Sequence, residues 1–485
     1  MNKRDIIGIL PTGTGKSLCY QLPAIFFENM TIVISPLVAL MKDQVDTFNA
    51  RGVPATSLNS HLTPKQMRER IEEIKEDRYK VIYIAPEKLF SEDFKDVITT
   101  LKIDHIAVDE AHCISQWGHD FRPKYKKIAL ALDSLPVRPV ISAFTATANQ
   151  RVIEDISKLL RLQSPVIFKT TFDRPNLFID VKLYEDKSDF VLKYVKGKSR
   201  ELGLVYCNTR LDAERLTKKL AKEGYRVGLY HAGLTKKERN KVQEEFFADE
   251  YQVLVATNAF GMGLDKDNIR YIIHLNMPAS LESYYQEIGR GGRDGLPCEC
   301  ILLFGLKDVM VNKALGKSRV YFKWRLREKE DWLEEMVRFA HTRDCYRQFV
   351  LSHFGEEIKP CGNCGNCLAD IMELDQSVPA QKVLSAIYHT KGFYGQGTIA
   401  IMLKGKLNQR INDKQLNKLS VFGIMKDWSE GEINTLITDL LIDGYLEKVQ
   451  EKLEERFVIT EEGIKLIKGD SKYINKVKKD KIKNK

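Results

Sequence analysis

The sequence predicts an α/β protein with two tandem domains built on parallel sheets, followed by a helical zinc-binding subdomain and a winged-helix domain. Three observations support this fold class. A glycine-rich loop, LPTGTGKS, occupies residues 10–17, short β-rich runs alternate twice with helical patterns, and a cluster of cysteines between residues 345 and 367 precedes a compact helical unit. A chain of 485 residues is also too long for a single hydrophobic core.

Composition narrows the class of protein. Hydrophobic residues make up 43% of the chain, and the formal net charge is +10 with 76 lysines and arginines. This excess favours polyanionic partners, although it is also compatible with ordinary solubility. No apolar run reaches the roughly 18 residues that would suggest a membrane span, and the amino terminus lacks the pattern of a secretory signal. We therefore expect a soluble intracellular protein.

The β-rich runs divide the larger part of the chain into two α/β domains. The first domain, residues 1–165, contains the runs DIIGIL, TIVISP, KVIYIAP, HIAVDEA and PVISAFTAT. The second domain, residues 166–310, contains the runs GLVYCN, RVGLYHA, QVLVATN and YIIHLN. Apolar runs that alternate with helical patterns are typical of strands buried in a parallel sheet.

Three shorter parts follow the α/β domains. Residues 311–372 are helical and charged and run into the cysteine cluster. Residues 373–466 combine helical periodicity with a strand-like FVIT, in a size and order that fit a winged helix. The remaining polar, lysine-rich tail, residues 467–485, is expected to be disordered.

The glycine-rich loop is the first candidate site. In the general form G-x-x-x-x-G-K-[ST], backbone N–H groups meet phosphates, the lysine meets the terminal phosphates and the hydroxyl binds Mg²⁺. Leu10 stands where the first glycine is expected. The predicted nucleotide-binding residues are Thr12, Gly13, Thr14, Gly15, Lys16 and Ser17. The alternative is a glycine-rich turn that caps a helix.

A pair of acidic residues follows a β-rich run in IAVDEAHC. Asp109 and Glu110 would lie at the carboxyl edge of a parallel sheet, where ligands bind in such folds. Asp109 can hold Mg²⁺ while Glu110 orients water; the alternative is that both residues cap the next helix. Because phosphoryl transfer depends mostly on positioning and charge stabilisation, the pair and Lys16 together predict ATP hydrolysis.

The second α/β domain carries a pair of arginines in QEIGRGGRDG. Arg290 and Arg293 lie on a glycine-rich turn. A guanidinium that a separate domain inserts can stabilise the charge developing on a γ-phosphate. This arrangement predicts that closure of the two domains senses ATP. By themselves, the same arginines are equally compatible with solvent exposure or with binding of DNA phosphates.

In a cytosolic chain, clustered cysteines indicate a metal site rather than a disulfide. A C-x2-C-x2-C run follows a single cysteine on a predicted helix, and the four expected zinc ligands are Cys345, Cys361, Cys364 and Cys367. Thiolates without an open coordination position describe a closed structural zinc site. An iron–sulfur cluster is the main rival, but the bacterial ferredoxin run continues to a fourth cysteine and a proline, which are absent here.

The chain resembles the RecQ family of superfamily 2 DNA helicases over nearly its whole length. The motifs that carry the resemblance are LPTGTGKSLCYQ, SPLVALMKDQ, YIAPEKL, DEAHCISQWGHDFRPKY, FTATA, FDRPNL, VYCNTR, YHAGL, VATNAFGMGLDK and QEIGRGGRDG. The direct join of DEAH to CISQWGHDFRP is the most specific of them. The resemblance implies RecA-like sheets and an ATP-dependent helicase that moves 3′→5′ on single-stranded DNA in repair, recombination and replication.

The resemblance also implies roles for individual residues. Lys16 and Ser17 would bind phosphate and Mg²⁺, Asp109 would coordinate Mg²⁺, Glu110 would activate water, and the arginine pair would complete the site. In VATNAFGMGLDK, Gly263 permits close backbone approach, and Asp265 resembles a residue that the family uses near the nucleotide. The implied cofactors are ATP, Mg²⁺ and Zn²⁺.

The implied DNA contacts lie in three motifs. Residues 114–125 resemble the family's aromatic-rich coupling loop, and its candidate DNA-binding or coupling residues are Trp117, Phe121, Arg122 and Lys124. The aromatic rings offer flat faces to bases and the cations can meet phosphates; the alternative is that both aromatics are core residues. SPLVALMKDQ and YIAPEKL resemble strand-tracking motifs, with Ser35, Lys42 and Glu87 as plausible contacts.

The winged unit and the two ends of the chain complete the expectations. A hairpin is expected from about Leu446 to Ile459; its charged tip has no aromatic residue to wedge between base pairs. The lysine-rich tail is expected either to add salt-sensitive DNA affinity or only to aid solubility. The family's usual N-terminal segment, which recognises adenine, does not precede the phosphate-binding loop here.

The expected partners are single-stranded and forked DNA, with a single-strand-binding protein or recombination proteins as further candidates. We expect a monomer in the cytoplasm, associated with the nucleoid as in bacteria, and no membrane partner. The competing hypothesis is a fork-binding or strand-annealing module whose ATPase is impaired by the missing N-terminal segment. An RNA helicase of the DEAH type conflicts with the CISQWGHDFRP loop and the winged unit.

Overall fold

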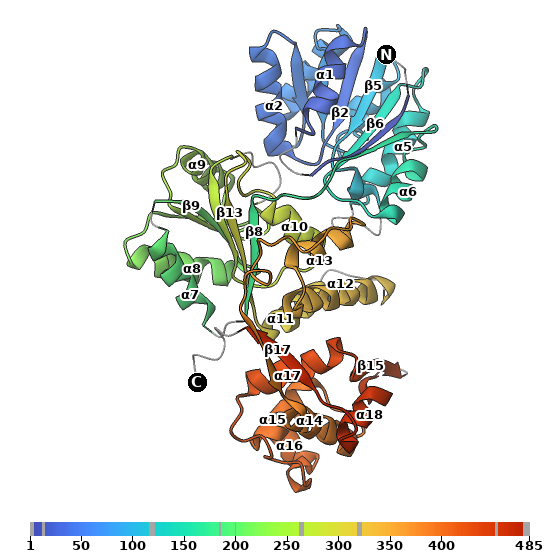
Figure 1. Ribbon diagram of the computed structural model, residues 1–485. Coiled ribbons are helices and arrows are strands. Elements are labelled where there is room, and N and C mark those ends of the chain that lie inside the picture. The colour runs from blue at the N-terminus through green and yellow to red at the C-terminus, as the bar shows by residue number, and fades with distance from the viewer. Residues whose placement is uncertain are drawn as a thin grey trace. The chain divides into compact units, whose positions relative to one another are not determined.

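A computed structural model (Figure 1) describes residues 4–11, 15–115, 122–183, 186–198, 200–260, 266–317, 323–451 and 454–478. The chain forms two compact units. The first comprises Met1–Ala340 and Asp344–Cys367, and the second comprises His341–Arg343 and Leu368–Lys485. Each unit is described by itself below.

The first unit begins with a seven-stranded sheet in the order β3-β4-β2-β5-β6-β1-β7. All of its strand pairs are parallel. Its strands are β1 (Ile6–Ile9), β2 (Met30–Ile34), β3 (Ala55–Leu58), β4 (Val81–Ile84), β5 (Ile103–Val108), β6 (Val140–Thr145) and β7 (Val166–Lys169). The central strands are almost wholly apolar and buried, as a parallel sheet covered by helices requires.

Helical segments connect these strands, because parallel neighbours need a crossover. They are α1 (Leu18–Phe26), α2 (Val38–Ala50), α3 (Pro64–Lys75), α4 (Glu92–Ile98), α5 (Ile128–Asp133) and α6 (Gln150–Leu159), with short 3₁₀ turns at Ala111–Ile114 and Tyr125–Lys127. The sequence determines some helix starts directly. At α3, Thr63 accepts from the backbone N–H of Gln66, whose side chain bonds back to Thr63 in a capping box.

The boundary predicted between the two α/β domains, after residue 165, was wrong by one strand. β7 pairs with β1 in parallel, with Val166 opposite Ile6, so it completes the first sheet. Its side chains are half-buried or exposed, as expected of an edge strand, which is why its sequence did not indicate its partner. The second domain therefore follows a connector, residues 170–176.

The second sheet of the first unit has six parallel strands in the order β10-β11-β9-β12-β13-β8. Its strands are β8 (Leu177–Leu183), β9 (Leu202–Tyr206), β10 (Val227–Tyr230), β11 (Val253–Ala256), β12 (Ile269–His274) and β13 (Cys298–Phe304), and its helices are α7 (Lys187–Gly197), α8 (Arg210–Lys222), α9 (Lys236–Phe247) and α10 (Leu281–Ile288). The fold class predicted from the sequence, two tandem parallel-sheet domains, is confirmed.

Three helices, α11 (Leu306–Lys317), α12 (Lys323–His341) and α13 (Tyr346–His353), lead into the cysteine cluster. Cys345 was expected on a helix; it is instead the N-cap of α13, and its sulfur accepts from the backbone N–H of Gln348. Among the helices that the described residues form, none combines the length and the apolar character needed to cross a bilayer.

The second unit has its own hydrophobic core and contains β14 (Ile371–Asp375), α14 (Ser377–His389), α15 (Gln396–Lys404), α16 (Gln409–Asp413), α17 (Glu430–Ile442), β15 (Leu446–Glu451), β16 (Glu454–Ile459), α18 (Glu461–Lys468) and β17 (Ile474–Lys478). β15 and β16 pair antiparallel from Leu446 opposite Ile459, so the predicted hairpin is confirmed. Its tip, residues 452 and 453, lies outside the described residues.

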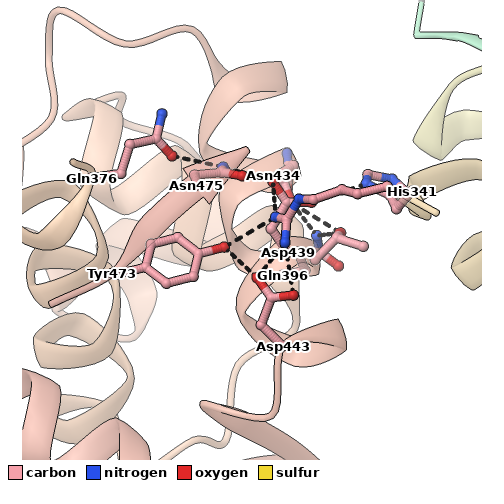
Figure 2. A network of polar contacts seen from close by, with 10 residues as sticks. His341, Gln376, Gln396, Asn434, Asp439, Asp443, Tyr473 and Asn475 are labelled. Atoms are coloured by element: carbon pink, nitrogen blue, oxygen red, sulfur yellow. Dashed lines mark hydrogen bonds and ion pairs between the residues drawn. The ribbon is translucent and has the colours of Figure 1, made fainter. Parts of the chain in front are cut away.

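The expectation of a disordered tail after residue 466 was wrong for its first part. β17 pairs antiparallel with β14, so the two ends of the second unit form one ribbon. Tyr473 is 2% exposed and Asn475 is 3% exposed. Figure 2 shows both side chains turned into a polar network, in which Asn475 donates to Gln376 at 2.9 Å and to Asp439 at 3.2 Å. Burial of Tyr473 and Asn475 orders this segment, although its lysine-rich composition is typical of disorder.

Candidate functional site

The first candidate site forms where neighbouring strands end. In the sheet, β1, β6, β5 and β2 are consecutive neighbours, so the residues that follow them share the carboxyl edge. The register sets Ile9 opposite Thr145 and Ile34 opposite Val108. The phosphate-binding loop, the DEAH segment and the serine after β2 therefore meet at one edge, which is where ligands bind in open parallel sheets.

The end of the phosphate-binding loop is described from Gly15. Gly15 has φ +80°, a left-handed conformation that glycine adopts without strain. Lys16 Nζ lies 3.6 Å from Glu110 Oε1, and Ser17 is the N-cap of α1 with no side-chain cap bond. The loop residues Thr12, Gly13 and Thr14 lie outside the described residues.

Asp109 lies at the centre of this edge and is 3% exposed. Its Oδ2 accepts from Ser35 Oγ at 3.2 Å, and its Oδ1 accepts from the backbone N–H of Glu110 at 2.9 Å. Burial raises the pKa of Asp109, with a smaller contribution from Glu110, and the charge of Lys16 opposes the shift. Each oxygen keeps a lone pair for a further partner, so the carboxylate fits a metal ligand.

Ser35 differs from the sequence-based expectation. It was a plausible DNA-strand contact, but it is 2% exposed and its hydroxyl points at the Asp109 carboxylate. Its backbone follows β2, next to β5 in the sheet, which brings the two side chains together. Lys42 and Glu87, the other residues of that expectation, are exposed.

Glu110 has an unusual backbone and an unused acceptor. Its φ is +47° and its ψ is 46°, the left-handed region, which costs a residue with a Cβ about 1–2 kcal/mol. Its buried Oε2 has no hydrogen-bond partner among the described residues. His112 Nδ1 lies 3.4 Å from that atom and hydrogen-bonds to Thr145 Oγ1 at 2.9 Å. A buried carboxylate with an open acceptor can take a proton from water.

The predicted coupling loop is described only at its two ends. Trp117 and Phe121 lie outside the described residues. Of the cations, Arg122 is half-buried and its backbone N–H donates to the Cys113 carbonyl at 2.9 Å, while Lys124 is exposed. The loop therefore leaves and rejoins the fold close to the DEAH segment.

The predicted arginines lie on the second sheet's side of the first unit, in a turn at residues 289–296 that we call the arginine turn. Arg290 is 4% exposed and Arg293 is half-buried. Burial raises the pKa of the Tyr206 phenol, and the neighbouring Arg290 guanidinium partly opposes the shift. Gly263 and Asp265, the remaining predicted nucleotide contacts, lie outside the described residues.

Sequence reasoning missed the residues that hold this turn. Arg174 and Asn176 belong to FDRPNL and hydrogen-bond to backbone carbonyls of the arginine turn. FDRPNL carried the family resemblance, but no residue pattern connected it with a turn so distant in the sequence. The polar Arg-Pro-Asn sequence next to an apolar strand was the available signal.

The four predicted metal ligands come together. All four sulfur atoms, of Cys345, Cys361, Cys364 and Cys367, lie within 4.8 Å of one another. Cys361 and Cys367 are 3.9 Å apart, as are Cys345 and Cys364. A tetrahedral zinc with Zn–S bonds near 2.3 Å places its sulfurs about 3.8 Å apart, so the cluster fits zinc with no open position.

Backbone N–H groups donate hydrogen bonds to these sulfurs. The N–H of Cys361 donates to Cys345 Sγ at 3.3 Å, and that of Asn363 donates to Cys361 Sγ at 3.4 Å. Burial acts to raise the pKa of Cys345, but the donated bonds from Cys361 and Gln348 outweigh it and lower the pKa to about 7. Burial, together with the neighbouring thiols, raises the pKa of Cys361 and Cys367, so Cys345 is the first of these thiols to ionise and the others lose their protons when a metal binds.

Known protein families match successive parts of the chain in the order of the fold. The DEAD/DEAH box helicase family matches residues 1–156, and the helicase conserved C-terminal domain matches residues 186–295. The RecQ zinc-binding family matches residues 307–368, and the RQC domain matches residues 371–484. These ranges correspond to the two sheets, the cysteine cluster and the second unit.

Curated relatives match nearly the whole chain. The ATP-dependent DNA helicase RecQ of Bacillus subtilis is 43% identical over 465 residues, which cover 95% of this chain and 78% of the relative. The RecQ helicases of Pasteurella multocida and Haemophilus influenzae are 39% and 38% identical; the matches cover 96% and 97% of this chain and 74% and 76% of those relatives. The chain belongs to the RecQ family.

As a RecQ-family member the protein is an ATP-dependent helicase, and the family assignment agrees with zinc at the cysteine cluster and with ATP as the nucleotide. Solved structures agree on the fold. Saccharomyces cerevisiae Dbp5 bound to RNA and ADP BeF3 matches with TM-score 0.52 at 18% identity, covering 69% of this chain and 89% of Dbp5. Mycobacterium smegmatis Lhr bound to ssDNA and AMP-PNP matches with TM-score 0.52 at 16% identity, covering 94% of this chain and 57% of Lhr.

Proposed function

We propose that this RecQ helicase hydrolyses ATP to ADP and phosphate and uses the cycle to move 3′→5′ along single-stranded DNA, opening duplex ahead of it. The observation that carries the proposal is the meeting of Lys16, Asp109 and Glu110 at one sheet edge. Membership of the RecQ family supports DNA as the nucleic acid, and the family resemblance supports the direction of movement.

In the proposed reaction, Lys16 and the backbone at Gly15 bind the phosphates, and Thr12, Gly13 and Thr14 complete the loop around them. Ser17 and Asp109 would hold Mg²⁺, which would supply positive charge to neutralise the phosphate oxygens. Glu110 orients the attacking water and accepts its proton at Oε2, which accepts no hydrogen bond from the described residues. The short Lys16–Glu110 separation supports one shared site for phosphate and water.

The second sheet contributes to the same reaction in this proposal. Arg290 and Arg293 stabilise the charge that develops on the γ-phosphate, and Gly263 and Asp265 approach the nucleotide from the same domain. Because these groups come from a separate domain, ATP binding closes the two domains and hydrolysis releases them. Each such cycle moves the bound strand by a small step.

The proposed DNA contacts begin next to the DEAH segment. Trp117 and Phe121 stack on bases of the single strand, while Arg122 and Lys124 meet its phosphates. The tie between Arg122 and Cys113 supports coupling, because movement of this loop is transmitted to a segment three residues from Glu110. The RQC-type second unit binds the duplex at the fork.

The proposed setting is DNA repair, recombination and replication in the bacterial cytoplasm, in association with the nucleoid. The protein acts as a monomer on single-stranded and forked DNA. A single-strand-binding protein and recombination proteins are its proposed protein partners.

Steady-state ATP hydrolysis with and without single-stranded DNA, on this chain and on Lys16→Ala, tests the proposal. DNA-stimulated turnover that the substitution abolishes is the expected result, since the Lys16 ammonium lies 3.6 Å from the Glu110 carboxylate at the proposed phosphate site. Turnover no greater than that of Lys16→Ala, with fork binding intact, would instead indicate a fork-binding or strand-annealing module. Strong stimulation by RNA but not by DNA would contradict the proposed substrate.

A further inference from the structure

The arginine turn is held by a side chain from the connector that precedes β8. Arg174 donates through Nη2 to the carbonyl oxygens of Gly291 at 3.0 Å and Gly292 at 2.9 Å. Its Nη1 lies 3.5 Å from the carbonyl oxygen of Gly289. Because the guanidinium is planar and rigid, one side chain sets the spacing of carbonyls on both sides of Arg290.

A second connector side chain holds the far half of the turn. Asn176 donates through Nδ2 to the carbonyl oxygens of Gly292 at 2.8 Å and Leu296 at 2.9 Å, and its Oδ1 accepts from Arg174 Nε at 3.3 Å. Gly292 has φ +53°, and a Cβ there would lie 2.5 Å from the Leu296 oxygen and 2.6 Å from Asn176 Nδ2. Only glycine allows this close approach.

The zinc-binding subdomain holds the connector from its other side. Arg347 on α13 donates through Nη2 to the carbonyl oxygens of Pro175 at 3.0 Å and Leu177 at 2.7 Å. Glu356, just after α13, accepts from the backbone N–H of Phe172 at 2.8 Å. The connector is therefore fixed between the cysteine cluster's helix and the arginine turn, with hydrogen bonds to both.

We propose that Arg174 and Asn176 are positioning residues for ATP hydrolysis, which keep the arginine turn in the place from which its arginines act on the nucleotide. This inference rests on the proposed function, because the turn needs fixed placement only if Arg290 and Arg293 contribute to hydrolysis. Both residues act through backbone carbonyls of the turn. The zinc-binding subdomain supports the same turn indirectly, because Arg347 holds the connector that carries Arg174 and Asn176.

The test is ATP hydrolysis at saturating single-stranded DNA by Arg174→Ala and Asn176→Ala, each alone and combined with the double substitution Arg290→Ala, Arg293→Ala. Each single substitution is expected to lower kcat by about 10- to 100-fold, because misplacement of a catalytic group by about 1 Å has effects of that size. KM for ATP should change by less than about threefold, since the phosphate-binding loop is untouched. In the Arg290→Ala, Arg293→Ala background, which removes both arginines that the turn would position, Arg174→Ala should add no further loss of kcat.

Two further variants separate positioning from general damage. Lys198→Ala removes an ion pair of 2.7 Å between the residue after α7 and Glu299 on β13, a contact that involves neither the connector nor the arginine turn, and should keep the wild-type kcat. Arg174→Lys, which keeps the charge but offers a single ammonium, should give an intermediate kcat. If Arg174→Ala fails to fold by its thermal melting profile, Asn176→Ala decides, because it leaves Arg174 in place.

The outcomes distinguish the inference from the proposed function. Wild-type kcat in both Arg174→Ala and Asn176→Ala, with the Arg290→Ala, Arg293→Ala variant impaired, would overturn the inference and leave the role of the turn intact. A further full loss when Arg174→Ala is added to that double variant would also overturn it. Wild-type kcat in the double variant would overturn the proposed role of the arginines and the inference with it.

Discussion

Tyr473 donates its phenolic hydrogen to Asp443 Oδ2 at 2.7 Å, and this bond ties the segment before β17 to the end of α17. The same carboxylate accepts from Arg343 Nη1 through both of its oxygens, each at 2.8 Å. Figure 2 shows the tyrosine and the carboxylate facing each other within the network. Burial, and then the charges of Asp439 and Asp443, raise the pKa of Tyr473, so the phenol remains a donor at neutral pH.

Tyr473→Phe is expected to destabilise the second unit by about 1.5–3 kcal/mol, the usual range for a hydrogen bond to a charged group. The ring still fills its buried site, so the loss reports the bond. Urea unfolding followed by circular dichroism measures it. Tyr388→Phe is the matched control, because Tyr388 is 70% exposed and its hydroxyl supports no such network; equal losses in both variants would contradict the prediction.

His353 on α13 lies between two carboxylates of the first unit. Its Nε2 is 2.9 Å from Glu282 Oε1 on α10, and its Nδ1 is 2.7 Å from Glu335 Oε1 on α12. Burial lowers the pKa of His353, but the hydrogen bonds and charges of Glu282 and Glu335 outweigh it and raise the pKa to about 10. The protonated ring therefore joins three helices of the first unit, α10, α12 and α13.

This raised pKa makes stability depend on pH in a defined direction. Because the folded pKa exceeds the unfolded value of about 6.5, the stabilisation is complete below about pH 6.5 and is lost as pH rises towards about 10. The free energy of unfolding should fall by roughly 5 kcal/mol over that window, about 1.4 kcal/mol for each unit of pKa difference. His353→Gln should lack this part of the fall, so the difference between the two proteins isolates it; parallel pH profiles would contradict the assignment.

The arrangement of the first two domains could be predicted from the sequence because buried parallel strands are apolar throughout. β4, for example, reads VIYI and all of its residues are buried. β7 and β17 escaped prediction for a different reason: half-exposed edge strands have mixed composition, and their pairing depends on partners far away in the sequence. Only the structure shows that β7 pairs with β1 and β17 with β14.

The contacts in the candidate sites also divide into those that the sequence predicts and those that only the structure shows. The spacing of the four clustered cysteines in the sequence predicts a metal site. The short motifs around Lys16 and Asp109 predict the chemistry of the phosphate site in the same way. The contact of Ser35 with Asp109 and that of Arg174 with the arginine turn depend on which strands and segments are neighbours in space. No local pattern encodes those distances.

Loss of the metal should destabilise the first unit. Cys364→Ser removes a fully buried thiolate from a four-sulfur site, so we expect zinc loss and a fall of about 4 kcal/mol or more in the free energy of unfolding. Zinc content by atomic emission and urea unfolding measure the two effects. Cys19→Ser, which changes an exposed cysteine outside the cluster, should keep one zinc per chain; retention of zinc by Cys364→Ser would contradict the four-cysteine site.

Glu110→Gln should separate ATP binding from hydrolysis. The amide keeps the size of the side chain but cannot accept a proton from water, so kcat should fall by about 10²- to 10⁴-fold while nucleotide affinity is kept. Lys16→Ala should instead weaken nucleotide binding. Equilibrium binding of a fluorescent ATP analogue and single-turnover hydrolysis distinguish the two variants. Wild-type hydrolysis by Glu110→Gln would exclude this carboxylate as the proton acceptor.

Ser35 has two candidate roles that an experiment can distinguish. Its hydroxyl is buried against Asp109, although its motif suggested contact with the DNA strand. If the hydroxyl orients the proposed Mg²⁺ ligand, Ser35→Ala should raise the Mg²⁺ concentration for half-maximal ATP hydrolysis by about tenfold, as loss of a partner of a metal ligand commonly does. Affinity for single-stranded DNA without nucleotide should not change.

Ser142→Ala is the matched control for that experiment. It removes another buried hydroxyl of the same sheet, hydrogen-bonded to His105 at 2.6 Å, but does not touch the carboxyl edge. Its Mg²⁺ dependence should equal that of the wild type even if its stability falls. An unchanged Mg²⁺ requirement in Ser35→Ala with weakened DNA binding would restore the strand-contact role, and would mean that Asp109 is held well enough by the backbone N–H of Glu110 alone.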